Sequence, residues 1–250
     1  MCVARDLRFR VVTNGSFAHS FDVARKQLSE LRDIGLNTVG LSWDSFHRTF
    51  IDPQCAINVI RACRELGISV QLTCVVTKRS TVAYALESLG DEGFDLKTVQ
   101  VKCLPVGRAE RKISADQFLP ASDWESNRAC QRDFDTVSLV HDGSVYPCCA
   151  VGGFTDAIAL GRYPDTSIVD LLRRREDDFK WMVLASQGPT FLMKFASHEE
   201  LAESGACEGL HDCVNCHRLF RKALGDVLVE RARHHVSEAV AKVFDEHDLV

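Results

Sequence analysis

Six cysteines in the second half of the sequence are the residues whose type and spacing are best suited to chemistry. They are Cys130, Cys148, Cys149, Cys207, Cys213 and Cys216. Cysteine thiolates are the standard ligands of structural zinc and of iron-sulfur clusters. Two residues separate Cys213 from Cys216, a spacing that lets two thiolates face one metal centre from a single turn. This pair therefore predicts half of a metal site.

The other half comes from a predicted β-hairpin. Twelve residues separate Cys130 from Gly143, and four separate Gly143 from Cys148. The apolar segments 137–140 and 144–146 flank a turn at 141–143, so Cys130 and Cys148 should come close together. Cys149 is adjacent to Cys148 and should point to the opposite side of a strand. We predict a four-thiolate site of Cys130, Cys148, Cys213 and Cys216, with Cys207 and Cys149 as alternates.

The spacing alone leaves the identity of the metal open. Zinc also takes four thiolates, and a CxxC pair does not distinguish it from iron. Cys213 to His217 matches the CxxCH pattern of covalent haem attachment, which requires export, and the sequence shows no signal peptide. Four other cysteines lie in helical or strand patterns and are interpreted as core residues: Cys55, Cys63, Cys74 and Cys103.

Composition narrows the class of protein. Eleven cysteines in 250 residues are many for a chain without a secretory segment, and a reducing cytoplasm favours metal binding over disulfides. A net charge of -5 and a pI near 6.0 give no general attraction to nucleic acid or anionic membranes. No segment approaches the 18 apolar residues of a membrane helix. We expect a cytoplasmic protein with neither nucleic-acid nor membrane partners.

The first 110 residues alternate short apolar runs with longer helical patterns, which indicates an α/β fold with a parallel sheet. The predicted strands are 7–13, 37–42, 68–76 and 98–104, and the predicted helices are 22–34, 53–66 and 81–89. Longer helices are predicted at 168–184 and from 218 to about 244, the latter as an amphipathic cap. Polar residues cluster after each strand, at the edge where parallel sheets carry functional loops.

The cysteine pattern resembles that of a known family. The run C-x12-G-x4-C with a later cysteine group is similar to the SPASM and twitch auxiliary-cluster domains of radical S-adenosylmethionine enzymes. Segments 13–15, 41–47 and 104–109 resemble the ends of the third, fourth and sixth barrel strands of that superfamily. The resemblance covers about residues 7–220 and favours iron-sulfur over zinc. It implies a partial radical SAM barrel over 1–111, a SPASM/twitch-like domain over 112–217, and a C-terminal amphipathic helix over 218–250.

Four residues acquire candidate roles from this resemblance. Ser42 and Asp44 match the fourth-strand position near the ribose or methionyl part of S-adenosylmethionine, although both could instead cap the following helix. His47 matches a position that helps to line the substrate cavity in the family. The alternative is that it is a histidine on a surface loop. Arg108 is a candidate to pair with a carboxylate. The alternative is that it is a solvated residue of a loop.

One departure from the family limits the activity. Radical enzymes of this type carry a C-x3-C-x2-C loop whose cluster binds S-adenosylmethionine, and the sequence contains no such triplet. By the resemblance, the chain starts at the third barrel strand and leaves residues 7–13 as an exposed strand edge. We expect S-adenosylmethionine to act only if a missing N-terminal part is supplied.

Three functions remain open. The first is the cluster-binding C-terminal portion of a radical SAM/SPASM enzyme that modifies a peptide or protein. The second is a non-catalytic module, binding a cluster or zinc, that recognises a peptide or complements an N-terminal partner chain. The third is an unrelated zinc-stabilised α/β protein.

Overall fold

The computed structural model describes residues 9–120, 130, 136–148 and 154–247. The chain divides into two compact units. The first contains Met1–Cys103 and Ala109–Leu119, and the second contains Leu104–Arg108 and Pro120–Val250. Each unit has its own hydrophobic core, and each is described here by itself.

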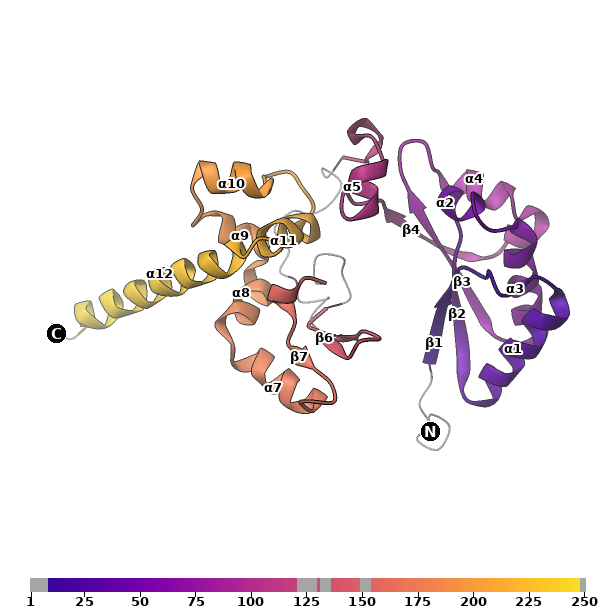
Figure 1. The fold of residues 1–250 in the computed structure, drawn as a ribbon, viewed down its shortest axis with the longest axis horizontal. Coiled ribbons are helices and arrows are strands. Elements are labelled where there is room, and N and C mark those ends of the chain that lie inside the picture. Colours follow the sequence, from indigo (N-terminus) through magenta and orange to yellow (C-terminus); the bar gives the residue numbers. More distant parts are fainter. Residues whose placement is uncertain (1–8, 121–129, 131–135, 149–153, 248–250) are drawn as a thin grey trace. The chain divides into compact units, whose positions relative to one another are not determined.

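The first unit is a four-stranded parallel sheet with helices on one face (Figure 1). The strands are β1 (Phe9–Thr13), β2 (Leu36–Ser42), β3 (Ser69–Val76) and β4 (Lys97–Lys102), paired in that order. The helices between them are α1 (Phe21–Asp33), α2 (Ser45–Arg48), α3 (Pro53–Leu66) and α4 (Val82–Glu87). The predicted α/β class, strand order and parallel direction are confirmed.

Side-chain caps set where these helices begin. Ser20 accepts a hydrogen bond from the Val23 main chain at α1, and Thr81 accepts one from Tyr84 at α4. Asp52 caps α3 by accepting from the Gln54 N–H at 2.8 Å, and Pro53 occupies the first helical turn. The same helix ends at Gly67, whose φ of +69° is the left-handed conformation that glycine adopts most easily.

The core of the first unit lies between the sheet and the helices. Alternate strand residues such as Val39, Leu41, Leu72 and Cys74 are fully buried there. The edge strand β1 pairs with β2 alone among the described strands. Its Val12 side chain is 65% exposed. This strand is the edge that the sequence predicted.

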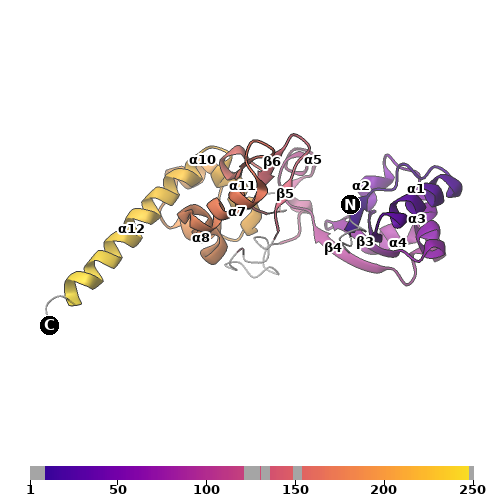
Figure 2. The same cartoon turned by 90° about the horizontal axis from the view of Figure 1, so that it is seen from below.

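The second unit combines a small antiparallel sheet with a set of helices. Strands β5 (Ser138–Leu139), β6 (Ser144–Tyr146) and β7 (Gly161–Arg162) form the sheet. The helices that follow are α7 (Ile168–Asp177), α8 (Phe179–Gln187), α9 (Pro189–Met193), α10 (His198–Ser204), α11 (Asp212–Phe220) and α12 (Leu224–His247). A core around Trp181, Leu192, Leu219 and Leu228 joins α8, α9, α11 and α12, and Leu201 of α10 packs against it. The C-terminal part of α12 extends beyond the other helices of its unit (Figures 1 and 2).

Two predicted helices are each divided in the structure. The helix predicted over 168–184 breaks at Asp178, whose extended backbone and carboxylate cap the start of α8 through the Lys180 N–H. The helix predicted from Arg218 onward begins earlier, at Asp212, and breaks before Leu224. Ala223 has a φ of +60° there, which a continuous α-helix does not allow. Six charged residues, 173–178, end at the first break, whereas apolar residues such as Phe220 and Leu224 continue on both sides of the second.

The hairpin turn at Gly143 gives the first testable prediction. Gly143 has a φ of +91°, and a Cβ atom there would lie 2.3 Å from the Tyr163 carbonyl oxygen. We expect Gly143→Ala to cost roughly 3 kcal/mol because strain and overlap add. Gly209→Ala is the control, since Gly209 has a similar φ of +80° and no atom within 4 Å. It should cost about 1 kcal/mol. Equal losses in urea unfolding would show that the close approach to β7 is unimportant.

Candidate functional site

The hairpin places Cys148 in the interior of the second unit. Strands β5 and β6 pair antiparallel, with Leu139 opposite Val145, and the turn between them is closed by Asp142, which accepts from the Ser144 N–H at 2.8 Å. Cys148 follows β6 and is 8% exposed. Cys130 is partly buried, and the alternate Cys149 lies outside the described residues. The turn of the hairpin is formed as the sequence predicted.

The remaining two cysteines of the predicted set begin helix α11. His211 caps this helix, and its Nδ1 accepts a hydrogen bond from the Cys213 N–H at 3.1 Å. Cys213 and Cys216 are three residues apart on the helix, so their side chains lie on the same face. Cys216 packs against the hydrophobic core of the unit. The CxxC pair is thus presented by the first turns of a helix, where the helix dipole favours negative charge.

The electrostatics of Cys216 connect all four predicted ligands. Burial raises the pKa of the Cys216 thiol well above its usual value, and the neighbouring thiols of Cys130, Cys213 and Cys148 raise it further. The pKa of Cys216 therefore responds to Cys213 on its own helix and to two cysteines that lie far from it in sequence. Among the described residues, no three His, Cys, Asp or Glu side chains are arranged as around a single metal ion.

The alternate Cys207 has a different setting. It is exposed, and its main chain is held by the Asn215 side chain. The Cys207 N–H donates to Asn215 Oδ1 at 3.2 Å, and Asn215 Nδ2 donates back to the Cys207 carbonyl oxygen at 3.1 Å. Asn215 lies between the two cysteines of the CxxC pair and is 1% exposed. Sequence reasoning missed this residue; its position inside the pair was the one available signal.

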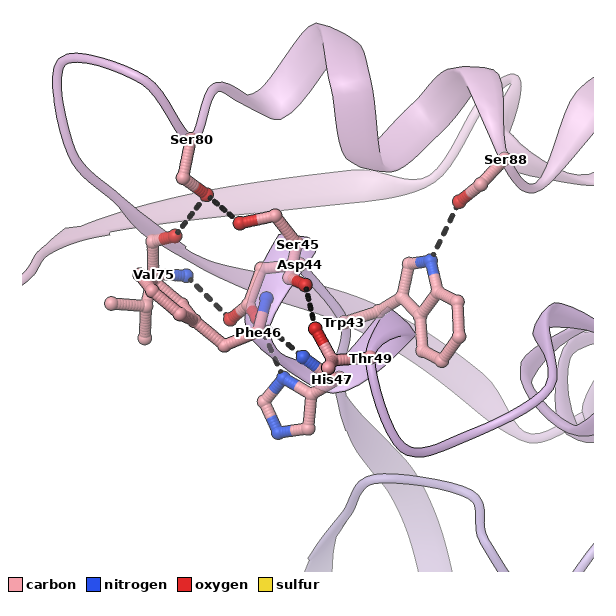
Figure 3. A network of polar contacts seen from close by, with 9 residues as sticks. All are labelled: Trp43, Asp44, Ser45, Phe46, His47, Thr49, Val75, Ser80 and Ser88. Atoms are coloured by element: carbon pink, nitrogen blue, oxygen red, sulfur yellow. Dashed lines mark hydrogen bonds and ion pairs between the residues drawn. The ribbon is translucent and has the colours of Figure 1, made fainter. Parts of the chain in front are cut away.

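In the first unit, Asp44 lies at the carboxyl end of β2 in a network of hydrogen bonds (Figure 3). Its side chain is 1% exposed. Oδ1 accepts from the main-chain N–H groups of Phe46 and His47, and Oδ2 accepts from the Val75 N–H at 3.1 Å. The His47 Nδ1 lies 2.8 Å from Oδ1. The carboxylate therefore caps α2 and ties it to β3.

Burial by itself would raise the pKa of Asp44. The hydrogen bond and charge of His47, with the main-chain donors of His47 and Val75, outweigh burial and lower the pKa below 3.8. Asp44 is thus held as a carboxylate. The second ring nitrogen of His47 points away from the network in Figure 3.

The other candidates from the sequence occupy simpler positions. Ser42 is the last residue of β2, is partly buried, and lies opposite Thr73 of β3. Arg108 is exposed at the start of α5 (Arg108–Lys112). Sequence reasoning did not foresee the contact of Ser45 Oγ with Ser80 Oγ at 2.6 Å, which joins α2 to the segment after β3.

Comparison with known proteins gives one relationship to report. No family model matches the sequence. The chain is 21% identical over 179 residues to the "Putative peptide biosynthesis protein YydG" of Bacillus subtilis (strain 168). The aligned region covers 71% of this chain and 56% of that protein, so the chain spans about half the length of the curated relative it matches. In the described part of the chain, no helix has the length and apolar character needed to cross a membrane.

The Asp44 network gives a prediction about stability and pH. In Asp44→Asn, an amide nitrogen replaces one acceptor oxygen and leaves a buried main-chain donor unpaired, so the first unit should lose about 2 kcal/mol at neutral pH. The folded pKa of Asp44 lies below the unfolded value. Its contribution is therefore complete above about pH 4 and is lost as the pH falls through the folded pKa.

Urea unfolding at several pH values measures this difference. The gap between the wild type and Asp44→Asn should shrink as the pH falls below about 4. Asp52→Asn is the matched control, because Asp52 is also a cap but exposed, and asparagine caps helices about as well as aspartate. A gap that stays constant with pH would contradict the assigned role of the carboxylate.

Proposed function

We propose that this chain binds a 4Fe-4S cluster through Cys130, Cys148, Cys213 and Cys216 and serves as the auxiliary-cluster portion of a radical SAM-type system that modifies a peptide. The observation that carries the proposal is that Cys148 is buried just after strand β6, while Cys213 and Cys216 lie on the first turns of α11 in the same unit. The thiols of Cys130, Cys213 and Cys148 also raise the pKa of Cys216. Four thiolates suit an iron-sulfur cluster and also zinc.

Two further observations support the radical SAM part of the proposal. The parallel sheet β1–β4 with helices on one face is compatible with part of a (β/α) barrel. The relative's printed name refers to peptide biosynthesis, which agrees with a peptide or protein substrate. By the family resemblance, the chain would bear an auxiliary cluster in a SPASM/twitch-like domain.

The roles of the chain's own residues follow from their positions. In the proposed site, Cys148 is presented by the segment that follows β6, while His211 fixes the first turn of α11 through the Cys213 N–H. The core residues beside Cys216 keep water from that side of the site. A 4Fe-4S cluster held by four cysteines would supply one-electron transfer, because each iron would already have its protein ligand. S-adenosylmethionine would require a C-x3-C-x2-C segment from elsewhere, with Ser42 and Asp44 as candidate contacts.

The hydrogen bonds of Asp44 affect its candidate role as a contact for S-adenosylmethionine. Its carboxylate oxygens already face three main-chain donors and the His47 ring. If Asp44 contacts a cofactor, it does so in addition to its structural function. Ser42 takes no part in this network and is the simpler candidate contact.

A second candidate function is a non-catalytic cluster- or zinc-binding module that recognises a peptide or complements a partner chain. Val12 is exposed on the edge strand β1, although parallel sheets are ordinarily buried on both faces. An open edge strand can also pair with a strand of another chain. Both features favour a module that completes the sheet of a partner chain. Sedimentation of this chain mixed with a separately expressed protein carrying the C-x3-C-x2-C segment tests it. Val12→Lys should weaken the complex without changing the metal content.

Metal analysis after anaerobic reconstitution with iron and sulfide tests the ligand set. The wild type should retain about four irons per chain and develop a broad brown absorbance. Cys130→Ser, Cys148→Ser, Cys213→Ser and Cys216→Ser should each lose most of the iron, because a four-thiolate site loses a ligand in each case. Cys207→Ser and Cys55→Ser, which change an alternate ligand and a residue of the other unit, should retain it.

The outcomes separate the hypotheses. Stoichiometric zinc without colour would replace the iron-sulfur assignment with the zinc module. Full iron retention in Cys130→Ser or Cys148→Ser would refute the hairpin half of the site. If Cys207→Ser loses iron and one of the two α11 variants retains it, Cys207 replaces that cysteine of α11 as a ligand.

A further inference from the structure

A cavity of about 760 Å³ lies within the second unit. Its walls come from the end of α8, from α9 and α10, and from the segment that leads to α11. Phe191, Met193 and Leu201 provide apolar surface, Lys194 and His198 provide cationic or polar groups, and the exposed Cys207 lies at the boundary. The volume falls within the range of small-ligand sites, about 300 to 1,000 Å³.

The lining has the composition of a site for an amphipathic ligand. Met193 is buried, while Phe191 and Leu201 are partly buried, so an apolar group can pack on them. The Lys194 ammonium is exposed and lies over the Phe191 ring, 5.5 Å from its centre. Ser186, Gln187 and Thr190 add hydrogen-bonding groups. The acidic Glu208 also belongs to the lining. The cavity therefore offers an apolar surface, a nearby cation, one carboxylate and polar partners for amides.

The cavity is attached to the helix that carries the CxxC pair. Thr190, which lines the cavity, donates a 2.6 Å hydrogen bond to the carboxylate of Asp212, the first residue of α11. On the other side, the buried Asn215 fixes the Cys207 main chain through two hydrogen bonds. Asp212 directly precedes Cys213, and Asn215 directly precedes Cys216. The wall of the cavity and the candidate metal ligands are thus held by the same turns of one helix.

We propose that this cavity binds a short peptide segment, with an aliphatic side chain on Phe191 and Leu201 and a carboxylate beside Lys194. Aliphatic side chain, amide groups and carboxylate match three of the four kinds of surface that the lining presents. The identification of this peptide as the substrate rests on the proposed function. The binding site itself rests on the cavity and requires no metal.

The test uses the full chain without metal and two probes, N-acetyl-leucyl-glutamate and N-acetyl-leucinamide, with affinities measured by calorimetry. Ala202 lines the cavity on the exposed side of α10, so Ala202→Trp should fill the cavity and weaken binding of both probes at least about tenfold. The control is Glu203→Trp, an equally large change at the next residue of α10, exposed and outside the lining. It should leave both affinities unchanged.

Lys194→Ala tests the carboxylate partner separately. It should weaken binding of the glutamate probe by up to about fivefold, as for an exposed ion pair, and leave the leucinamide probe unaffected. Lys222→Ala, at an exposed lysine outside the lining, is its control. Bound probe should also slow alkylation of Cys207 by iodoacetamide, measured by mass spectrometry.

Absence of saturable binding, or equal losses in Ala202→Trp and Glu203→Trp, would overturn the proposal. Circular dichroism tests whether Ala202→Trp is folded. If that variant is unfolded, the affinities of Lys194→Ala for the two probes test the proposal instead. Probe binding without iron uptake would refute the cluster and retain the cavity. Iron uptake without probe binding would refute the peptide site and retain the cluster.

Discussion

The second unit depends on the burial of Cys216 beside three other thiols. Thiols that share a poorly solvated volume resist ionisation, because burial and mutual repulsion both disfavour the thiolate, and the raised pKa of Cys216 expresses both effects. A bound cation reverses this balance, since metal-bound thiols are deprotonated. In the proposed site, a bound cluster would remove the cost of ionising these thiols. Cys148 follows the hairpin that turns at Gly143, and Cys213 and Cys216 lie near the capped start of α11.

Helix α11 joins the candidate metal centre to the cavity. The two cysteines are on the helix, while Asp212 and Asn215, their sequence neighbours, hold Thr190 and Cys207 of the cavity wall. These hydrogen bonds are partly buried, and they tie the cavity wall directly to the turns of α11 that carry the two cysteines. In the first unit, Asp44 has a comparable structural function, because one carboxylate connects α2 to β3 at the carboxyl edge of the sheet.

Local patterns predicted much of the secondary structure. The four parallel strands and the three longer helices of the first unit followed from apolar runs, capping residues and glycine stops, and α3 has the predicted bounds. The hairpin followed from Gly143 and its flanking strands. The two divided helices show the limit of this reasoning. Asp178 has an extended backbone and caps α8 locally, at the end of six charged residues, while Ala223 has a positive φ between α11 and α12.

The sequence by itself determined the residue types and the spacings: a CxxC pair, a glycine-centred hairpin between two cysteines, and the absence of a C-x3-C-x2-C triplet. These are local properties, fixed by chain connectivity and turn geometry. Only the tertiary structure decided that the thiols near the hairpin affect Cys216, that Asp44 is enclosed by main-chain donors, and that Asn215 binds Cys207. Those contacts join residues from different elements, and their distances depend on how the elements pack, which no spacing along the chain specifies.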